Sequence, residues 1–432
     1  MSQPVLTDTP AAKRSRYAYA LECSFEYFVS ILVSDAFLAK LLSYTGISDA
    51  TTGIISSLMS LSFLFQLFSI FIMRRITNAK RFVTVIHTLS GLFFMCLYFV
   101  PFLPFAVRYK ELLIVLCILT AYFGNYFVST ILFKWANSYV DPYHRAEYSG
   151  IKEMISLLSG IAVSLAAGRI IDSFEGADAL DRGFLFIAAA IFVFTLCDMI
   201  CLLLIQGKRP EKEREESAPL REVLRATFGS RDFRHVIVLS VLWCTAVYTT
   251  RGFLGTYQVN PHELAFSVGT IQVFQLIGNL GRFFATRPFG RFSDRTSYTH
   301  GIKTALFFGA AAFACGALIA PRTRFLVPVY MILYAVCQAG QNQNMMNITY
   351  SYVDQRYLAQ AMAIKNSIGG TCGFLASLLA SRLLAFIQKN GNSFLGLPVY
   401  GQQVLCTISL VLLVAEILFI HFVVEKQKIL RQ

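Results

Sequence analysis

Charged side chains are scarce in this sequence. Asp, Glu, Lys and Arg make up 15% of the 432 residues, whereas soluble domains of ordinary composition contain about 25%. Hydrophobic residues make up 56%, and the mean hydropathy is +0.57. Apolar runs of about 20 residues, long enough to cross a bilayer as helices, recur along the whole length. The composition excludes an ordinary soluble domain and predicts an integral membrane protein.

Motifs for nucleotide, metal or covalent chemistry are also missing. The sequence has no GxxxxGK[ST] or GxSxG, no CxxC pair among its ten cysteines, and no local metal-ligand spacing. The cysteines fall in or beside apolar runs and are interpreted as small buried hydrophobes. We therefore expect no enzyme activity, no cofactor and no metal site. Because no apolar segment precedes the first basic residues, we expect no cleaved signal peptide either.

An internal repeat is present at an offset of 213 residues. Residues 141–169 and 354–382 align without a gap, and ten of the 29 positions keep their residue. Apolar composition explains matching Leu, Ile and Ala, but matching Asp, Lys and Arg in one register indicates two copies of one unit. The conserved lysines of this alignment are Lys152 and Lys365.

The apolar runs predict an all-α membrane protein with twelve transmembrane helices in two pseudo-symmetric six-helix bundles. We expect an N-terminal bundle over 1–205, a cytoplasmic linker with an amphipathic helix over 206–235, and a C-terminal bundle over 236–432. The predicted spans, with edges good to about three residues, are 17–43, 50–73, 82–104, 110–133, 146–168, 183–205, 236–256, 264–286, 302–320, 326–346, 359–385 and 402–424.

The distribution of basic residues predicts the orientation. Of the 38 Lys and Arg residues, 25 lie in the tails and connections on the side of the N-terminus. The positive-inside rule then places both termini in the cytoplasm. The net charge of +13 is explained by anionic lipid headgroups and not by nucleic acid. We expect a monomer in a bacterial cytoplasmic membrane.

Carboxylates within the first span are candidates for ion coupling. Glu22 and Glu26 are one helical turn apart, and Glu26 lies about 15 Å into the span at 1.5 Å per residue. Charges at that depth are costly and mark functional sites. Glu26 is the first candidate for a proton-coupling group, whereas Glu22 can also reach the cytoplasmic surface. The alternative for Glu26 is a permanent ion pair with Lys152 or Lys365. These two lysines have alternative roles of their own, which are to bind an anionic substrate or to line a gate.

Amide and aromatic side chains within the other spans indicate a polar solute pathway. Unpaired amides facing lipid would be costly, so these side chains must face inward, and some of them join neighbouring helices. The predicted cavity residues are Tyr122, Asn125, Tyr126, Lys152, Trp243, Arg251, Gln272, Gln275, Asn279, Gln338, Gln341, Asn342, Lys365 and Asn366.

The two six-span halves, the basic linker and the repeat resemble the major facilitator superfamily. Residues 290–295, GRFSDR, are similar to the first part of that family's loop signature, GxxxDR, but the downstream Gly-basic part is missing. The equivalent first-half loop at 74–81 lacks the acidic residue. The resemblance implies a gate in which Asp294 and Arg295 meet the start of span five near Arg145.

The sequence and the resemblance together predict a secondary active transporter that works by alternating access and is not an enzyme. The leading hypothesis is proton-coupled uptake of a sugar, glycoside or oligosaccharide, because Gln and Asn bond hydroxyls in both senses and aromatic faces stack on sugar rings. Sodium is the alternative coupling ion. There are three other hypotheses: an organic-anion carrier, a drug exporter and a non-transporting membrane scaffold. The organic-anion carrier would bind its substrate through Lys152, Lys365, Arg251 and Arg282.

Overall fold

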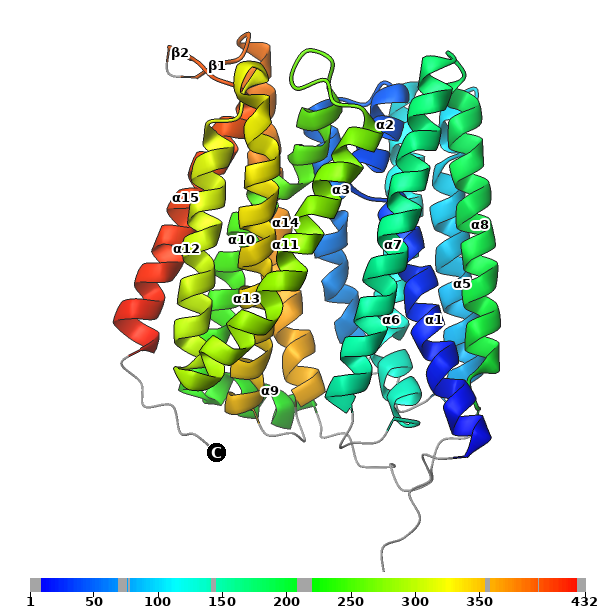
Figure 1. The fold of residues 1–432 in the computed structure, drawn as a ribbon, viewed down its shortest axis with the longest axis vertical. Coiled ribbons are helices and arrows are strands. Elements are labelled where there is room, and N and C mark those ends of the chain that lie inside the picture. The colour runs from blue at the N-terminus through cyan, green and yellow to red at the C-terminus, as the bar shows by residue number, and fades with distance from the viewer. Residues whose placement is uncertain are drawn as a thin grey trace, which may run out of the picture. The chain divides into compact units, whose positions relative to one another are not determined.

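The computed structural model describes residues 9–68, 76, 78–140, 145–207, 220–353, 358–394 and 396–425. The predicted all-α membrane fold is confirmed, because nearly every described residue is helical (Figure 1). Nine helices within the described ranges are long and apolar enough to cross a membrane. Among the described helices of 20 or more residues, α1, α11 and α12 do not meet that criterion.

The chain forms two compact units. Unit 1 comprises residues 1–47 and 65–217, and unit 2 comprises residues 48–64 and 218–432. The helices of unit 1 are α1 (Pro10–Leu32), α2 (Asp35–Tyr44), α5 (Ala79–Leu97), the 3₁₀ turn η3 (Val100–Phe102), α6 (Val107–Asn137), α7 (Arg145–Gly176) and α8 (Leu180–Leu204).

Unit 2 contains most of the remaining elements and a two-stranded antiparallel ribbon. Its elements are α3 (Asp49–Ser62), α9 (Leu220–Gly229), α10 (Arg231–Val259), α11 (Val268–Arg295), α12 (Tyr298–Ala317), η6 (Pro321–Leu326), α13 (Val327–Tyr352), α14 (Leu358–Lys389), β1 (Ser393–Phe394), β2 (Leu397–Pro398), α15 (Gly401–Phe419) and the π-helical end η8 (Ile420–Val424), with η2 (Phe63–Phe65) at the boundary between the units.

The repeat is visible in the helix boundaries. α7 begins at 145 and ends at 176, and adding 213 gives 358 and 389, which are the ends of α14. Lys152 and Lys365 are therefore each the eighth residue of their helix. Two predicted spans differ clearly from the structure. The helix of span 82–104 already ends at Leu97, and span 17–43 is broken into α1 and α2. Asp35, with a φ of 46°, lies at this break, and the Tyr98 hydroxyl donates to the Leu32 carbonyl beside it.

Side-chain caps fix where several helices begin. Ser48, Ser230, Ser267 and Ser297 each accept a hydrogen bond from a backbone N–H three residues later, at 3.2–3.3 Å. Such caps satisfy N–H groups that have no partner within the helix. The caps explain why α3, α10, α11 and α12 begin at the residues that follow these serines.

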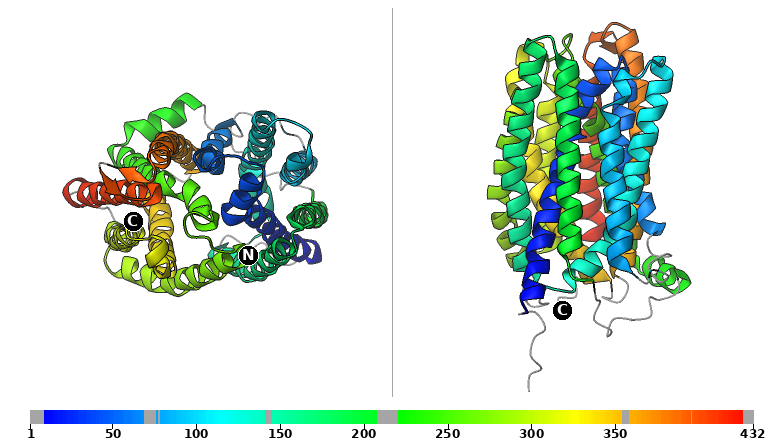
Figure 2. Two further views of the ribbon diagram at one scale, coloured as in Figure 1. Left: turned by 90° about the horizontal axis from the view of Figure 1, so that it is seen from above. Right: turned by 90° about the vertical axis from the view of Figure 1, so that its right-hand side faces the viewer.

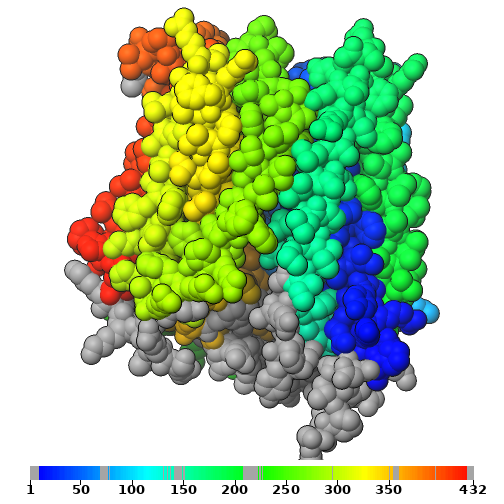
Figure 3. All heavy atoms as spheres, in the orientation of Figure 1, coloured from blue at the N-terminus to red at the C-terminus, as the bar shows by residue number. Residues whose placement is uncertain are grey.

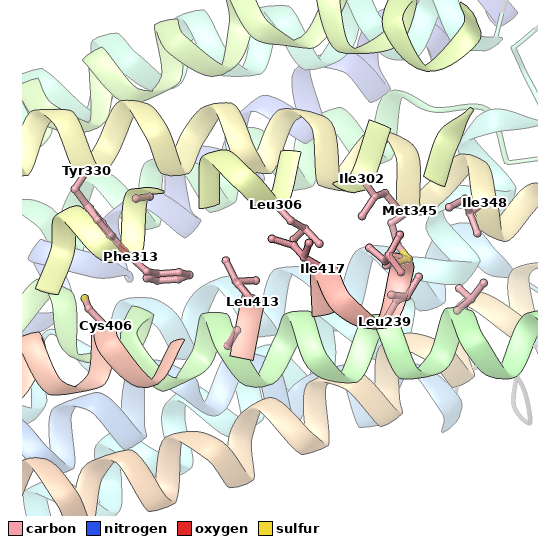
Figure 4. Close-up of a cluster of buried hydrophobic side chains, with 14 of the residues drawn as sticks. Leu239, Ile302, Leu306, Phe313, Tyr330, Met345, Ile348, Cys406, Leu413 and Ile417 are labelled. Atoms are coloured by element: carbon pink, nitrogen blue, oxygen red, sulfur yellow. The ribbon is translucent and has the colours of Figure 1, made fainter. Parts of the chain in front are cut away.

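A large apolar cluster forms the core of unit 2. Figure 4 shows side chains of α10, α12, α13 and α15 meeting there, including the fully buried Phe313, Leu306 and Leu413. Because lipid is as apolar as this core, its stabilisation comes from close packing and dispersion and not from exclusion of water. Large apolar side chains such as Phe284 and Leu379 remain about 70% exposed, as expected for lipid-facing positions.

Helix α3 packs in unit 2, against α10 and α14. Figure 2 (left) shows α3 end-on beside α14. A Cβ on Gly252 would lie 2.5 Å from the Gly53 carbonyl oxygen, so this close approach of α10 to α3 requires glycine. At the start of α3, the Asp49 carboxylate accepts from Asn260 Nδ2 (2.7 Å) and Gln388 Nε2 (3.1 Å). Polar contacts therefore hold the beginning of α3 to the ends of α10 and α14.

Glu263, in the connection between α10 and α11, adds a titratable group to this junction. Burial and then the nearby Asp49 charge raise the pKa of Glu263 to about 8. An unfolded-state pKa near 4.3 is typical of Glu. The folded state therefore holds the proton more tightly, and the stability that this contributes is present below about pH 4 and is lost as the pH rises toward 8.

We expect the thermal midpoint of the purified wild type to fall more between pH 5 and pH 8 than that of Glu263→Gln, because the neutral amide cannot ionise. Scanning fluorimetry at four pH values in one detergent measures this difference. Asp49→Asn removes the charge next to Glu263. Like Glu263→Gln, it should make the fall of the thermal midpoint between pH 5 and pH 8 smaller than in the wild type. If the thermal midpoints of the wild type and Glu263→Gln fall equally with pH, ionisation of Glu263 is not the cause of the loss of stability.

Candidate functional site

A cluster of carboxylates around one imidazole lies inside unit 1. Glu22 and Glu26 are on the same face of α1, because residues four apart in a helix are neighbours. His87 projects from α5 and Asp198 from α8. One ligand atom each from Glu22, Glu26 and His87 lie within 4.8 Å of one another. Three helices that are far apart in sequence therefore converge on this cluster, which we call the carboxylate–imidazole cluster (Glu22, Glu26, His87, Asp198).

Asp198 fixes the orientation of the imidazole. Its Oδ2 atom lies 2.8 Å from His87 Nδ1, and the two side chains are only 5% and 6% exposed. With Nδ1 bonded to this carboxylate, the other ring nitrogen is directed to α1, where Nε2 lies 3.6 Å from Glu26 Oε1. A carboxylate bond at one ring nitrogen sets what the other nitrogen can bind. Nε2 is therefore the reactive atom of His87.

The two glutamates differ in their access to the surroundings. Glu22 is fully buried, which corrects the expectation that it can reach the surface. Its Oε2 accepts a hydrogen bond from the Cys23 thiol (3.2 Å), whereas Oε1 has no partner among the described residues. The Glu26 side chain is 42% exposed. Glu26 is therefore the partly exposed member of the pair, and Glu22 is the buried one.

Lys152 of α7 supplies the nearest positive charge. Figure 3 shows α1 and α7 side by side, and Lys152 Nζ lies 3.2 Å from Cys23 Sγ and 4.3 Å from the centre of the Tyr19 ring. Its charge also acts on Glu26. Lys365, the repeat-related residue in unit 2, is 7% exposed. The two lysines share a helical position but differ in burial, since Lys152 is half-buried.

Buried amides in unit 2 form the second polar feature. Gln341 is 1% exposed, and neither its Nε2 nor its Oε1 has a partner among the described residues. Asn344, one turn later on α13, is fully buried and has an unpartnered Oδ1. Unpaired buried amide atoms are costly, so these atoms are notable as polar groups that the described residues leave without a hydrogen-bond partner.

The other predicted cavity residues differ in exposure. Gln272 is buried, whereas Gln275, one turn later on α11, is half-buried. Within α13, Asn342 is exposed beside the buried Gln341. Arg251 is also exposed, and the half-buried members are Tyr122, Asn125, Tyr126, Lys152, Trp243, Gln275, Asn279, Gln338 and Asn366.

The predicted gate lies outside the described side chains. The helical backbones of Arg145 and Asp294 are described but their side chains are not, and the two residues belong to different units. Arg295 ends α11 and is exposed. The gate therefore remains a prediction.

His87 and Asp198 were missed by the sequence interpretation. They are 111 positions apart, so no local spacing reveals them as partners. The available signal was an Asp in the apolar interior of α8, the most apolar of the candidate spans. The sequence also gave no role to Glu416 of α15, which is fully buried next to the apolar cluster and whose two carboxyl oxygens have no partner among the described residues.

One comparison with known proteins identifies a family. A family model described as Major Facilitator Superfamily matches residues 23–422. None of the curated proteins matches the sequence.

Solved structures of several transporters have a similar fold. The chain is 14% identical to the nucleoside transporter NupG, with 96% of this chain and 98% of that chain covered and a TM-score of 0.68. It is 12% identical to a D-xylose–proton symporter (94% and 97% covered, TM-score 0.70). It is also 14% identical to a bacterial homologue of the human lysosomal transporter Spinster (96% and 97% covered, TM-score 0.66). At these identities the similarity establishes the fold alone.

We expect His87 and Asp198 to be energetically coupled. Breaking a buried charged pair by removing one partner typically costs about 3–5 kcal/mol, so Asp198→Asn should lower the free energy of unfolding by about that much. A double-mutant cycle with His87→Gln, measured by denaturant unfolding in mixed micelles, should give a coupling of at least about 1 kcal/mol. Additive effects of the two substitutions would show that the hydrogen bond does not hold α5 to α8.

Proposed function

The chain belongs to the major facilitator superfamily, and from that premise we propose that it is a proton-coupled secondary transporter for the uptake of a hydroxyl-rich solute such as a sugar, glycoside or oligosaccharide. It moves this solute by alternating access as a monomer in a bacterial cytoplasmic membrane, with both termini inside. Two structurally similar proteins are named as a nucleoside transporter and as a D-xylose–proton symporter. Both kinds of solute carry hydroxyl groups on a sugar ring.

The carboxylate–imidazole cluster is the observation that carries the proposal. A coupling group must take up a proton from one side and release it to the other, so it must be shielded but reachable. Glu26 meets this requirement, because it is partly exposed while its neighbours Glu22, His87 and Asp198 are buried. The neighbouring acid and base give the proton several sites within one cluster, and such clusters at membrane depth mark proton pathways.

Glu26→Gln should abolish gradient-driven accumulation of the solute but retain exchange of labelled for unlabelled solute, because the amide mimics the protonated acid. A thermal-shift screen of sugars, glycosides and nucleosides first identifies the solute. Uptake into proteoliposomes with an imposed proton gradient then measures accumulation, and counterflow measures exchange.

Glu175→Gln is the matched control for this experiment. It makes the same change in the same unit, at an exposed glutamate that bonds Lys40. It should accumulate solute as the wild type does. Full accumulation by Glu26→Gln with an unchanged pH dependence would eliminate Glu26 as the coupling group and point to Glu153 or to sodium.

The buried amides of α13 support a hydroxyl-rich solute. The amide group of Gln341 can donate and accept hydrogen bonds at the same time, as a sugar hydroxyl also does. Both of its polar atoms lack a partner among the described residues, so a hydroxyl pair that reaches this buried amide when the protein changes conformation would satisfy them.

Gln341→Ala should weaken solute binding by about 1–3 kcal/mol, the cost of leaving a hydrogen-bonding group of the ligand unpaired. Isothermal titration with the solute identified by the screen measures the loss. Asn342→Ala, at the exposed neighbouring position, should have a smaller effect. Unchanged affinity in folded Gln341→Ala would move the solute site away from α13.

A further inference from the structure

The strongest feature not explained by solute transport is the incomplete bonding of the carboxylate–imidazole cluster. Glu22 Oε1 is completely buried and has no partner among the described residues, and the same is true of Asp198 Oδ1. Buried ionised carboxylates are stable only when opposite charge and hydrogen bonds compensate for the lost water. A bound cation would supply the positive charge and the bonding partner that these buried carboxylates lack.

The arrangement of the donors is that of a metal site. A histidine that ligates a metal almost always donates its other ring N–H to a carboxylate or carbonyl, which fixes the tautomer and the ring orientation. Asp198 has this relation to His87 Nδ1 at 2.8 Å. The free Nε2 then faces the two carboxylates of α1, which gives one nitrogen and two oxygen donors and leaves a further position open, as in catalytic zinc sites.

The size of the cluster also fits. Three atoms that are at most 4.8 Å apart lie within 4.8/√3, or about 2.8 Å, of a common centre. Metal–nitrogen and metal–oxygen distances are about 2.0–2.2 Å. Each donor therefore needs to move inward by less than about 1 Å, which rotation of the glutamate side chains can supply without moving the helices.

The charge count indicates a divalent ion. Glu22, Glu26 and Asp198 carry three negative charges when ionised, and Lys152 supplies one positive charge beside them, so the sum with neutral His87 is −2. One divalent cation brings this sum to zero. An imidazole ligand favours a first-row transition ion such as Zn²⁺, Co²⁺ or Mn²⁺ over Mg²⁺ or Ca²⁺, which prefer oxygen ligands.

We propose that Glu22, Glu26 and His87 bind one divalent transition-metal ion within unit 1, and that Asp198 is the positioning residue that orients His87. The exposed part of Glu26 is the entry point, and the buried Glu22 is the inner ligand. The site requires neither the solute nor the transport direction proposed above, because it rests on the donors and their geometry.

Direct binding of Co²⁺ to the purified full-length protein tests this proposal. Co²⁺ is a spectroscopic substitute for Zn²⁺, and its visible d–d bands report the coordination number. After removal of metals with EDTA, titration should give one Co²⁺ per chain with bands of a four- or five-coordinate N/O site, and Zn²⁺ should displace it. Mg²⁺ at millimolar concentration should not.

Variants distinguish this site from adventitious binding. His87→Gln and Glu22→Gln should each lower Co²⁺ affinity by more than 100-fold. Asp198→Asn should lower it by about 10–100-fold, the effect typical of an outer partner, and should also shift the d–d bands because the ring is reoriented. His421→Gln, at an exposed histidine of unit 2, should bind as the wild type does, and Cys23→Ser should retain the bands.

The proposal is overturned if the folded wild type binds no stoichiometric Co²⁺, or if His87→Gln and Glu22→Gln, shown to be folded by their thermal transitions, bind it unchanged. A wild type that binds no metal but loses accumulation on Glu26→Gln would overturn the metal site and leave proton coupling standing. If the wild type binds metal and its Glu26→Gln variant accumulates solute normally, the metal site stands and proton coupling at Glu26 is overturned.

Discussion

The hydrogen bond between Asp198 and His87 is the constraint on which the functional part of unit 1 depends. It joins α8 to α5 across 111 residues of sequence. Both partners are buried, since the two side chains are only 5% and 6% exposed. An imidazole left to rotate would present either nitrogen to α1. Held at Nδ1, it presents Nε2 to Glu26. The imidazole that faces the glutamates of α1 is thus oriented by a residue on a third helix, α8.

The two units carry different kinds of polar chemistry. Unit 1 concentrates ionisable groups around one imidazole, with Lys152 beside them. Unit 2 has buried amides in α13, and its fully buried acid Glu416 lies beside an apolar cluster. Ionisable groups respond to protons and cations, whereas amides match hydroxyls. This division is the physical basis for assigning ion binding to unit 1 and solute contacts to unit 2.

Much of the fold was predictable from the sequence, because membrane helices follow from apolar length and the repeat has a fixed offset. The bounds of α7 and α14 repeat at 213 residues, and Glu26 was identified from its depth alone. The break before Asp35 was not predictable, since the apolar run continues through it. The partnership of His87 and Asp198 was also missed. It depends on how three helices pack, and neither residue has a local motif. The repeat offset of 213 pairs His87 with His300 but Asp198 with Val411, so the repeat does not mark the two as partners.

The state of His87 Nδ1 tests the central claim most directly. Nitrogen-15 NMR of histidine-labelled protein in lipid reports whether each ring nitrogen carries a proton, and a His87→Gln spectrum identifies the His87 signals among the six histidines. The account predicts a protonated Nδ1 bonded to Asp198 at neutral pH, and loss of that signal's strong hydrogen-bond shift in Asp198→Asn. An unprotonated Nδ1 at His87, or a signal unchanged by Asp198→Asn, would contradict it.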